Sequence, residues 1–143
     1  MYKTFVNSTF AILYAEETHS LEDIIELQKN HILTMKYMVG VDDKIDPGTK
    51  AFLNAFAIDM KIGNAEMFKP LLDVCDEVES VMNDSVMSPM EKIHIAKQIV
   101  SQRVLTLGIY KDVEEFEHDM NKSNLFISMS LGHPIIKVTE GDE

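Results

Sequence analysis

Apolar residues recur at helical spacing through the centre of the chain. Between Leu21 and Val39 they return about every 3.6 residues, which is the period of an α-helix. Ser20 stands where the N-cap of a helix accepts a backbone hydrogen bond, and Gly40 stands where a helix commonly ends. The pattern therefore predicts a helix over residues 21–39.

Two more helices are predicted to begin at prolines. Asp46-Pro47 precedes an apolar stripe that stops near Gly63, so we expect a helix between these points. Lys69 precedes Pro70 and is therefore disfavoured in helical geometry, which places the start of the next helix at Pro70. Its inward positions are Leu71, Val74, Cys75, Val78 and Met82.

The clearest helix start is Ser88-Pro89-Met90-Glu91, where a capping hydroxyl, a first-turn proline and a returning carboxylate stand at capping-box spacing. This helix is expected to run to Leu107, with Gly108 beyond its end. A shorter helix is expected from about Asp112 to Lys122. The apolar stripes predict that Leu107 in the first of these helices and Val113, Phe116 and Met120 in the second face the core.

The two ends of the chain are richer in β-forming residues. Residues 1–15 and 124–139 are expected to form a small antiparallel sheet, with Asn7-Ser8 as a turn and Gly132-His133-Pro134 as an interruption. A helix over Ser123–Leu131 is the alternative, and residues 140–143 read as a frayed tail. The whole pattern predicts one domain, residues 1–143, mainly α, built as a bundle of about five helices.

The net charge of the chain disfavours some classes of binding partner. The chain has a formal net charge of -11, and Arg103 is its only arginine. Such a surface disfavours direct binding to nucleic acid or to an anionic membrane, because both need basic side chains. The N-terminus carries no export signal and Cys75 is the sole cysteine, which together predict a cytoplasmic protein.

The sharpest chemical pattern is Glu-x-x-His, which occurs as Glu16/His19, Glu91/His94 and Glu115/His118. On a helix this spacing aims a carboxylate and an imidazole in one direction, as in dimetal bundles. The predicted apolar faces point elsewhere, and Glu91 has a capping role. These pairs, above all Glu91, His94, Glu115 and His118, are therefore weak metal candidates, and no cofactor is expected.

Two single residues suggest other chemistry. His31 falls on the apolar side of its helix, so we expect a buried imidazole whose hydrogen-bond partner is Gln28 or a group on a neighbouring helix. Cys75 lies on the inward face beside Asp76 and Glu77, whose charges raise a thiol pKa, so an activated nucleophile is not expected. The sequence contains no nucleophile elbow and no glycine-rich phosphate loop.

Methionines and acids instead suggest a binding surface. Flexible thioethers suit adaptable apolar contacts, and acidic fields can steer a basic partner. Methionines cluster around the loop before the capping box, and acids are dense just after residue 111. The predicted partner-binding residues are Met82, Val86, Met87, Met90, Asp112, Glu114, Glu115 and Glu117.

These observations predict a non-enzymatic acidic helical module that acts through protein contacts, as an adaptor, an assembly chaperone or an inhibitor. The partner is another protein or a second copy of this chain. A metal-binding helical bundle and an acidic mimic of nucleic acid remain as alternatives. In size, acidity and composition the chain resembles small phage accessory proteins, a resemblance that assigns no role to any residue.

Overall fold

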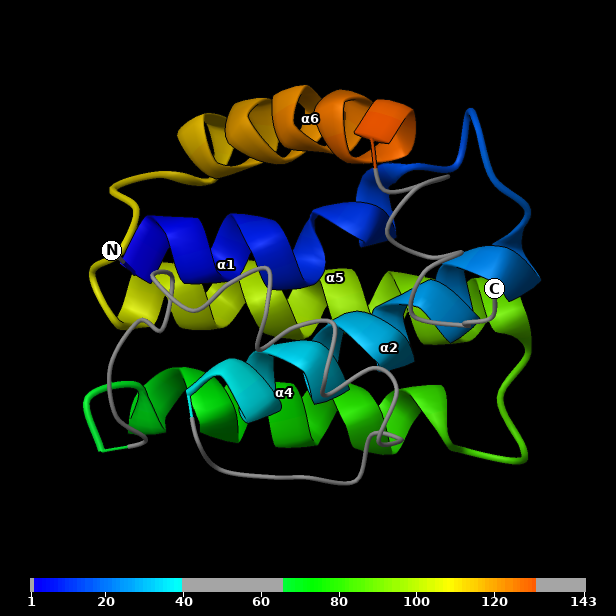
Figure 1. Cartoon of the computed structure of the whole chain (residues 1–143), viewed down its shortest axis with the longest axis horizontal. Helices are drawn as coiled ribbons and strands as arrows, with labels where there is room; N and C mark the ends of the chain where they lie inside the picture. Colours follow the sequence, from blue (N-terminus) through cyan, green and yellow to red (C-terminus); the bar gives the residue numbers. More distant parts are fainter. Residues whose placement is uncertain (1, 40–65, 131–143) are drawn as a thin grey trace.

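Five α-helices and one 3-10 helix make up most of the two ranges, residues 2–39 and 66–130, that the computed structural model describes. They are α1 (Tyr2–Phe10), η1 (Ala11–Tyr14), α2 (Leu21–Met38), α4 (Lys69–Met82), α5 (Pro89–Thr106) and α6 (Val113–Ser130). The α-helices run alternately in opposite directions across the molecule (Figure 1). The helix predicted to begin at Pro47 lies outside the described residues.

Aromatic side chains join segments that are far apart in the sequence. Phe5 of α1 stacks on Phe68, just before α4, with ring centroids 5.0 Å apart. Phe116 of α6 meets Tyr14 of η1 and Tyr110 edge-on, at 6.0 and 5.4 Å. Phe5, Phe68, Phe116 and Tyr110 are at most 2% exposed, so these contacts lie within the core. Burial of such large apolar groups is the main force that holds the helices together.

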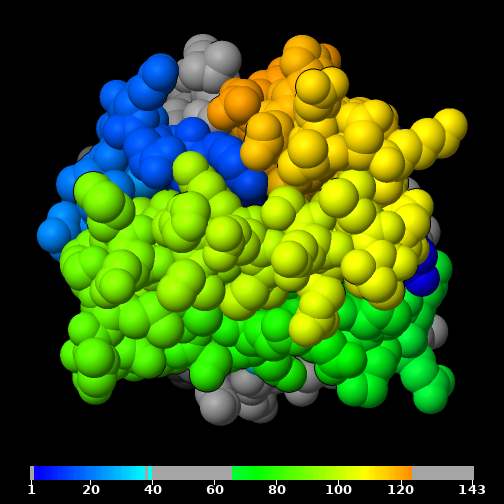
Figure 2. Space-filling model, turned by 180° about the vertical axis from the view of Figure 1, so that it is seen from behind, coloured from blue at the N-terminus to red at the C-terminus, as the bar shows by residue number. Residues whose placement is uncertain are grey.

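The helix α5 lies centrally and has well-formed ends. Seen from behind, it crosses the middle of the molecule between α4 on one side and α6 with the N-terminal segment on the other (Figure 2). Its C-terminus closes as predicted at Gly108, which adopts φ 73°. The Gly108 and Ile109 N–H groups donate to the carbonyls of Leu105 and Val104, which satisfies two carbonyls at the helix end.

An ion-pair cluster fastens α2 to α4. Lys36 is 9% exposed, and its Nζ donates to Asp76 at 2.7 Å and to Glu79 at 3.0 Å. Burial by itself lowers the pKa of Lys36, but the hydrogen bonds to both carboxylates outweigh burial and raise it. The ammonium group therefore stays charged between these two helices.

The prediction of strands at residues 1–15 is wrong. Residues 2–10 form α1, and the expected turn at Asn7 lies inside it. The buried residues Phe5, Val6, Thr9 and Phe10 follow helical spacing, so burial of one helical face overrides the strand preference of the individual residues. Thr9 also satisfies its hydroxyl inside the helix, donating to the Phe5 carbonyl at 2.7 Å.

The strand predicted from residue 124 is also wrong as far as residue 130, where the alternative of a helix is correct. The helix α6 continues from Val113 to Ser130, eight residues beyond the predicted Lys122 end. Neither glycine nor proline interrupts this stretch, and extending a helix costs less than starting a new element. Residues 131–139 and the tail 140–143 lie outside the described residues.

Candidate protein-interaction surface

The loop between α4 and α5 is held by one aspartate. The N–H groups of Val86 and Met87 donate to Asp84 Oδ1 at 2.7 and 2.9 Å. These two hydrogen bonds lower the pKa of Asp84, so its carboxylate stays charged and keeps accepting them at neutral pH. Hydrogen bonds within the loop itself therefore hold the backbone of Val86 and Met87.

The start of α5 fixes the other side of this loop. Glu91 N–H donates to Ser88 Oγ at 3.2 Å, and Ser88 N–H donates back to Glu91 Oε1 at 3.0 Å. The predicted capping box is thus confirmed, with Pro89 in the first turn. Lys92 Nζ donates to the Met82 carbonyl at 2.9 Å, which ties α5 to the last turn of α4.

This loop and the first turn of α5 expose two apolar side chains to solvent. Val86 is 89% exposed and Met90 is 70% exposed, the two largest values among the exposed large hydrophobic residues. Met87 is half-buried and packs against the core. We call Val86, Met87 and Met90 the displayed loop. Met82, which the sequence placed in the same contact surface, is fully buried beneath α5 and has no surface to offer a partner.

The predicted acidic part of the surface lies at the opposite end of the molecule. The helix α6 begins where α1 begins, whereas the displayed loop lies where α4 ends and α5 begins (Figure 1). Asp112 Oδ1 accepts from the Glu115 N–H at 2.8 Å and caps α6, and Glu115 pairs with Lys3 at 3.3 Å. Glu114 and Glu117 are exposed, so two of the four acids have structural roles. The sequence thus placed in one surface residues that the structure separates.

The glutamates of the Glu-x-x-His pairs have other partners. Glu91 belongs to the capping box, Glu115 pairs with Lys3, and Glu16 pairs with Lys97 at 2.8 Å. His94 and His118 are exposed. Among residues 2–39 and 66–130 no group of three or more histidines, cysteines or acids is arranged to hold a metal ion.

His31 is buried as predicted, but its predicted hydrogen bond is absent. The residue is 8% exposed, and its Nδ1 has no hydrogen-bond partner among the described residues, while Gln28 Nε2 donates to the Thr9 carbonyl at 2.7 Å. The buried Oε1 of Gln28 is also without a partner. Burial lowers the pKa of His31 from 6.5 to about 4, so the imidazole is neutral at physiological pH. Sequence spacing showed that Gln28 and His31 share a face but not that Thr9 competes for the amide.

Cys75 is buried in the core face of α4. Burial raises the pKa of its thiol to about 12, and the nearby Asp76 and Glu79 add to the effect against the opposing charge of Lys36. The expected inert thiol is consistent with these surroundings, although Glu79 rather than Glu77 is the second acid.

Sequence reasoning missed an apolar group at the end where α1, α4 and α6 begin. Leu107 and Val113 were expected in the core but are 41% and 40% exposed. Leu105, Tyr2 and Met67 complete this group at 37%, 42% and 41%. Helical spacing assigns a face but not a depth, and residues in the last or first turn of a helix extend beyond the neighbouring helices.

Comparison with known proteins finds no matching family model, no similar curated protein and no similar solved structure. None of the helices within the described ranges has the length and apolarity that crossing a membrane requires. Inference about function therefore depends on the geometry of the surface.

Proposed function

We propose that this protein is a non-enzymatic protein-interaction module, an adaptor, assembly chaperone or inhibitor, whose helices form one bundle that carries the displayed loop into contact with a partner. The single observation that carries this proposal is the 89% exposure of Val86 on a backbone fixed by Asp84 and the capping box. The cytoplasm is the expected location, in keeping with one buried, unpaired cysteine.

Fixed geometry is what distinguishes this loop from an incidental exposed residue. Leaving Val86 and Met90 in water forgoes roughly 25 cal/mol for every Å² of apolar surface that could be buried. A loop that is already ordered loses little conformational freedom when a partner covers it, so more of that free energy appears as affinity. The flexible thioether of Met90 beside the stiff Val86 lets the contact adapt in shape.

The proposal is tested with the double variant Val86→Ser and Met90→Ser. The full chain is immobilised and used to recover partners from an extract of its source cells, and the affinity of each purified partner is then measured. We expect about tenfold or greater weakening of binding, because apolar anchors at the centre of an interface dominate its energy. Unchanged circular dichroism and thermal midpoint establish that the variant is folded.

The matched control is Leu105→Ser with Leu107→Ser, which removes two exposed apolar residues from the other end of α5. This variant should bind as the wild type does. Equal binding by the Val86 and Met90 variant, or recovery of no partner by the wild-type chain, contradicts the proposed function. Light scattering on the wild-type chain shows whether the partner is a second copy.

A further inference from the structure

The displayed loop and the segment that precedes α2 lie at the same end of the molecule (Figure 1). Both α2 and α5 begin at this end of the molecule, each behind a capping serine, Ser20 and Ser88 (Figure 1). The view from behind shows the same two regions together at one end (Figure 2). The ion pair between Glu16 and Lys97 holds the segment before α2 against α5. We call residues 15–23 and 83–91 the capped end.

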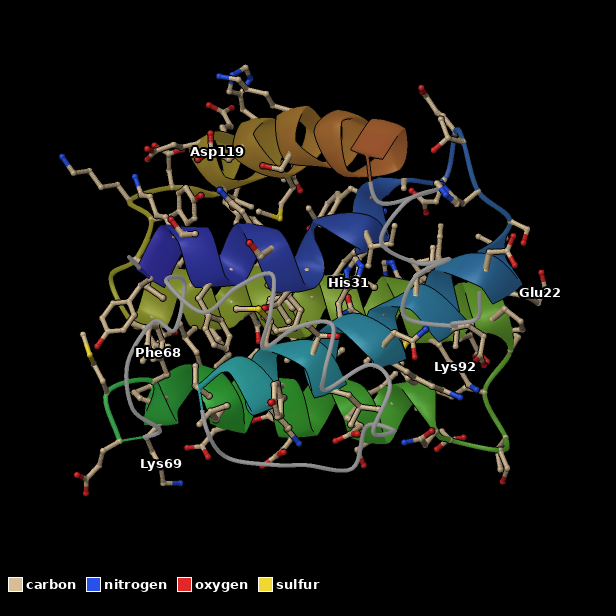
Figure 3. All side chains as sticks on the ribbon, in the orientation of Figure 1. Glu22, His31, Phe68, Lys69, Lys92 and Asp119 are labelled. Carbon is tan, nitrogen blue, oxygen red and sulfur yellow. The ribbon has the colours of Figure 1, made fainter. Side chains whose placement is uncertain are left out.

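Carboxylates at the capped end face solvent without cations to neutralise them. Glu17, Glu22 and Asp23 are exposed, and no ion pair of theirs is found within the described residues. Figure 3 shows Glu22 at the same end of the molecule as Lys92. Residues 17–23 lie at the same end of the molecule as the loop between α4 and α5 (Figure 1).

The lysines nearest this end are already engaged. Lys92 donates to the Met82 carbonyl at 2.9 Å, and Lys97 pairs with Glu16 and lies 4.6 Å from the centroid of the Tyr14 ring. The Lys97 side chain is 25% exposed. The capped end therefore offers a partner apolar contact surrounded by net negative charge.

We propose that the partner of the displayed loop is a protein with an apolar hollow edged by lysine or arginine side chains, which receive Val86 and Met90 in the hollow and Glu17, Glu22 and Asp23 at its edge. This inference rests on the proposed function. Charges at the edge of an interface speed association and exclude partners of like charge. A second copy of this chain, with the same acidic end and a net charge of -11, does not meet that description.

The edge contact is tested by neutralising three carboxylates in the full chain, Glu17→Gln, Glu22→Gln and Asp23→Asn. We expect association with the purified partner to slow about tenfold at low ionic strength, and the difference to shrink in high salt, because salt screens exposed charges. The matched control, Glu66→Gln, Asp73→Asn and Glu77→Gln, changes the net charge equally with residues that lie outside the capped end and outside the predicted partner-binding set, and should alter the association rate less than about twofold.

Zero-length carbodiimide cross-linking gives an independent readout, because it joins a carboxylate to a lysine amine only in direct contact. We expect cross-linked peptides that join residues 17–23 to lysines of the partner. If the three neutral substitutions leave association unchanged at low salt while the Val86 and Met90 substitutions weaken binding, this inference is wrong and the proposed function stands. A dimer of this chain that those apolar substitutions dissociate overturns it as well.

Discussion

The two ends of the molecule expose apolar side chains in different ways. At the capped end, Val86 is 89% exposed on a loop that Asp84 and the capping box hold, and Met90 is 70% exposed in the first turn of α5. At the opposite end, exposed apolar residues have values between 37% and 42%, and each belongs to a helix or directly adjoins one. The apolar side chains at the capped end are mostly exposed to solvent, whereas those at the opposite end are more than half buried.

The difference has a physical cause in how each end is built. At the opposite end Tyr2 rests edge-on against the buried Phe68 at 5.6 Å, so its exposed part is the remainder of a core contact. No comparable aromatic contact covers Val86. Partial exposure beside the core is common in folded proteins, but an almost fully exposed valine on an ordered loop has no role in packing. The comparison therefore separates a structural end from the end at which we propose that a partner binds.

The largest expected effect is on stability at the opposite end. Phe68→Ala should lower the free energy of unfolding by about 3 to 5 kcal/mol, because it removes a buried ring that stacks on Phe5. Denaturant unfolding followed by circular dichroism measures this. The control Val86→Ala should change it by less than about 0.5 kcal/mol. Similar losses in the two variants would break the distinction between the ends.

A pH experiment asks whether the ends unfold together. The folded pKa of His31 is lowered to about 4, so below its ordinary value of 6.5 the unfolded chain binds a proton that the folded chain does not. The neutral imidazole therefore contributes its full stability above pH 6.5, the ordinary pKa of histidine. As the pH falls from about 7 to about 5, the free energy of unfolding should decrease by about 2 kcal/mol.

The variant His31→Leu removes this titration and should flatten the pH dependence of unfolding in that window. Probes placed at each end should report one common transition, since His31 lies in α2, which extends from one end to the other (Figure 3). A wild-type chain whose stability is constant across this range contradicts the argument, and separate transitions would make the two ends independent units.

A smaller effect is expected from loosening the capped end. Ser88→Ala removes the hydroxyl that accepts from the Glu91 N–H and should cost about 1 kcal/mol of unfolding free energy. It should also weaken partner binding severalfold, because the loop then loses more freedom on binding. Val104→Ala removes buried methyl groups near the other end of α5, outside the capped end, and serves as a control with a comparable loss of stability. Equal binding by both variants would show that order in the displayed loop is irrelevant.

The smallest effect is expected when half-exposed apolar residues at the opposite end are replaced by polar ones. Leu107→Ser and Val113→Thr should each change the free energy of unfolding by about 0.5 kcal/mol or less and leave partner binding unaltered. Thermal unfolding and the binding assay measure the two quantities. A clear loss of binding would assign the interaction to this end and reverse the comparison.

The sequence predicted elements with strong end signals better than it predicted elements defined by composition. Ser20 and Ser88 cap their helices and Gly108 ends α5, because capping is local chemistry that a short motif contains. The N-terminal segment was misjudged because its helical form depends on burying Phe5 and Phe10 against distant helices. No local pattern contains those distant contacts.

The sequence indicated the position of part of the candidate site. Val86 lies in the short loop between α4 and α5 and Met90 lies in the first turn of α5, and both positions follow from the capping box that begins at Ser88. The acids of residues 17–23 were not associated with that loop, because only the packing of α2 beside α5 brings them to the same end. Helical spacing predicted Met82 on the inward face of α4, and its burial confirms that prediction, so the separate assignment of Met82 to the contact surface is wrong.

The contacts between α1 and α6 bear on the order of events during synthesis. Lys3 meets Glu115 and Asn7 meets Tyr110, so α1 finds these partners only after more than a hundred further residues have been joined. The helices α4 and α5 follow one another in the sequence, so they can pack together as soon as both have been synthesised. The Phe5 ring of a nascent chain also lacks its stacking partner until Phe68 has been synthesised, and a chaperone that shields Phe5 in that interval should raise the yield of native protein.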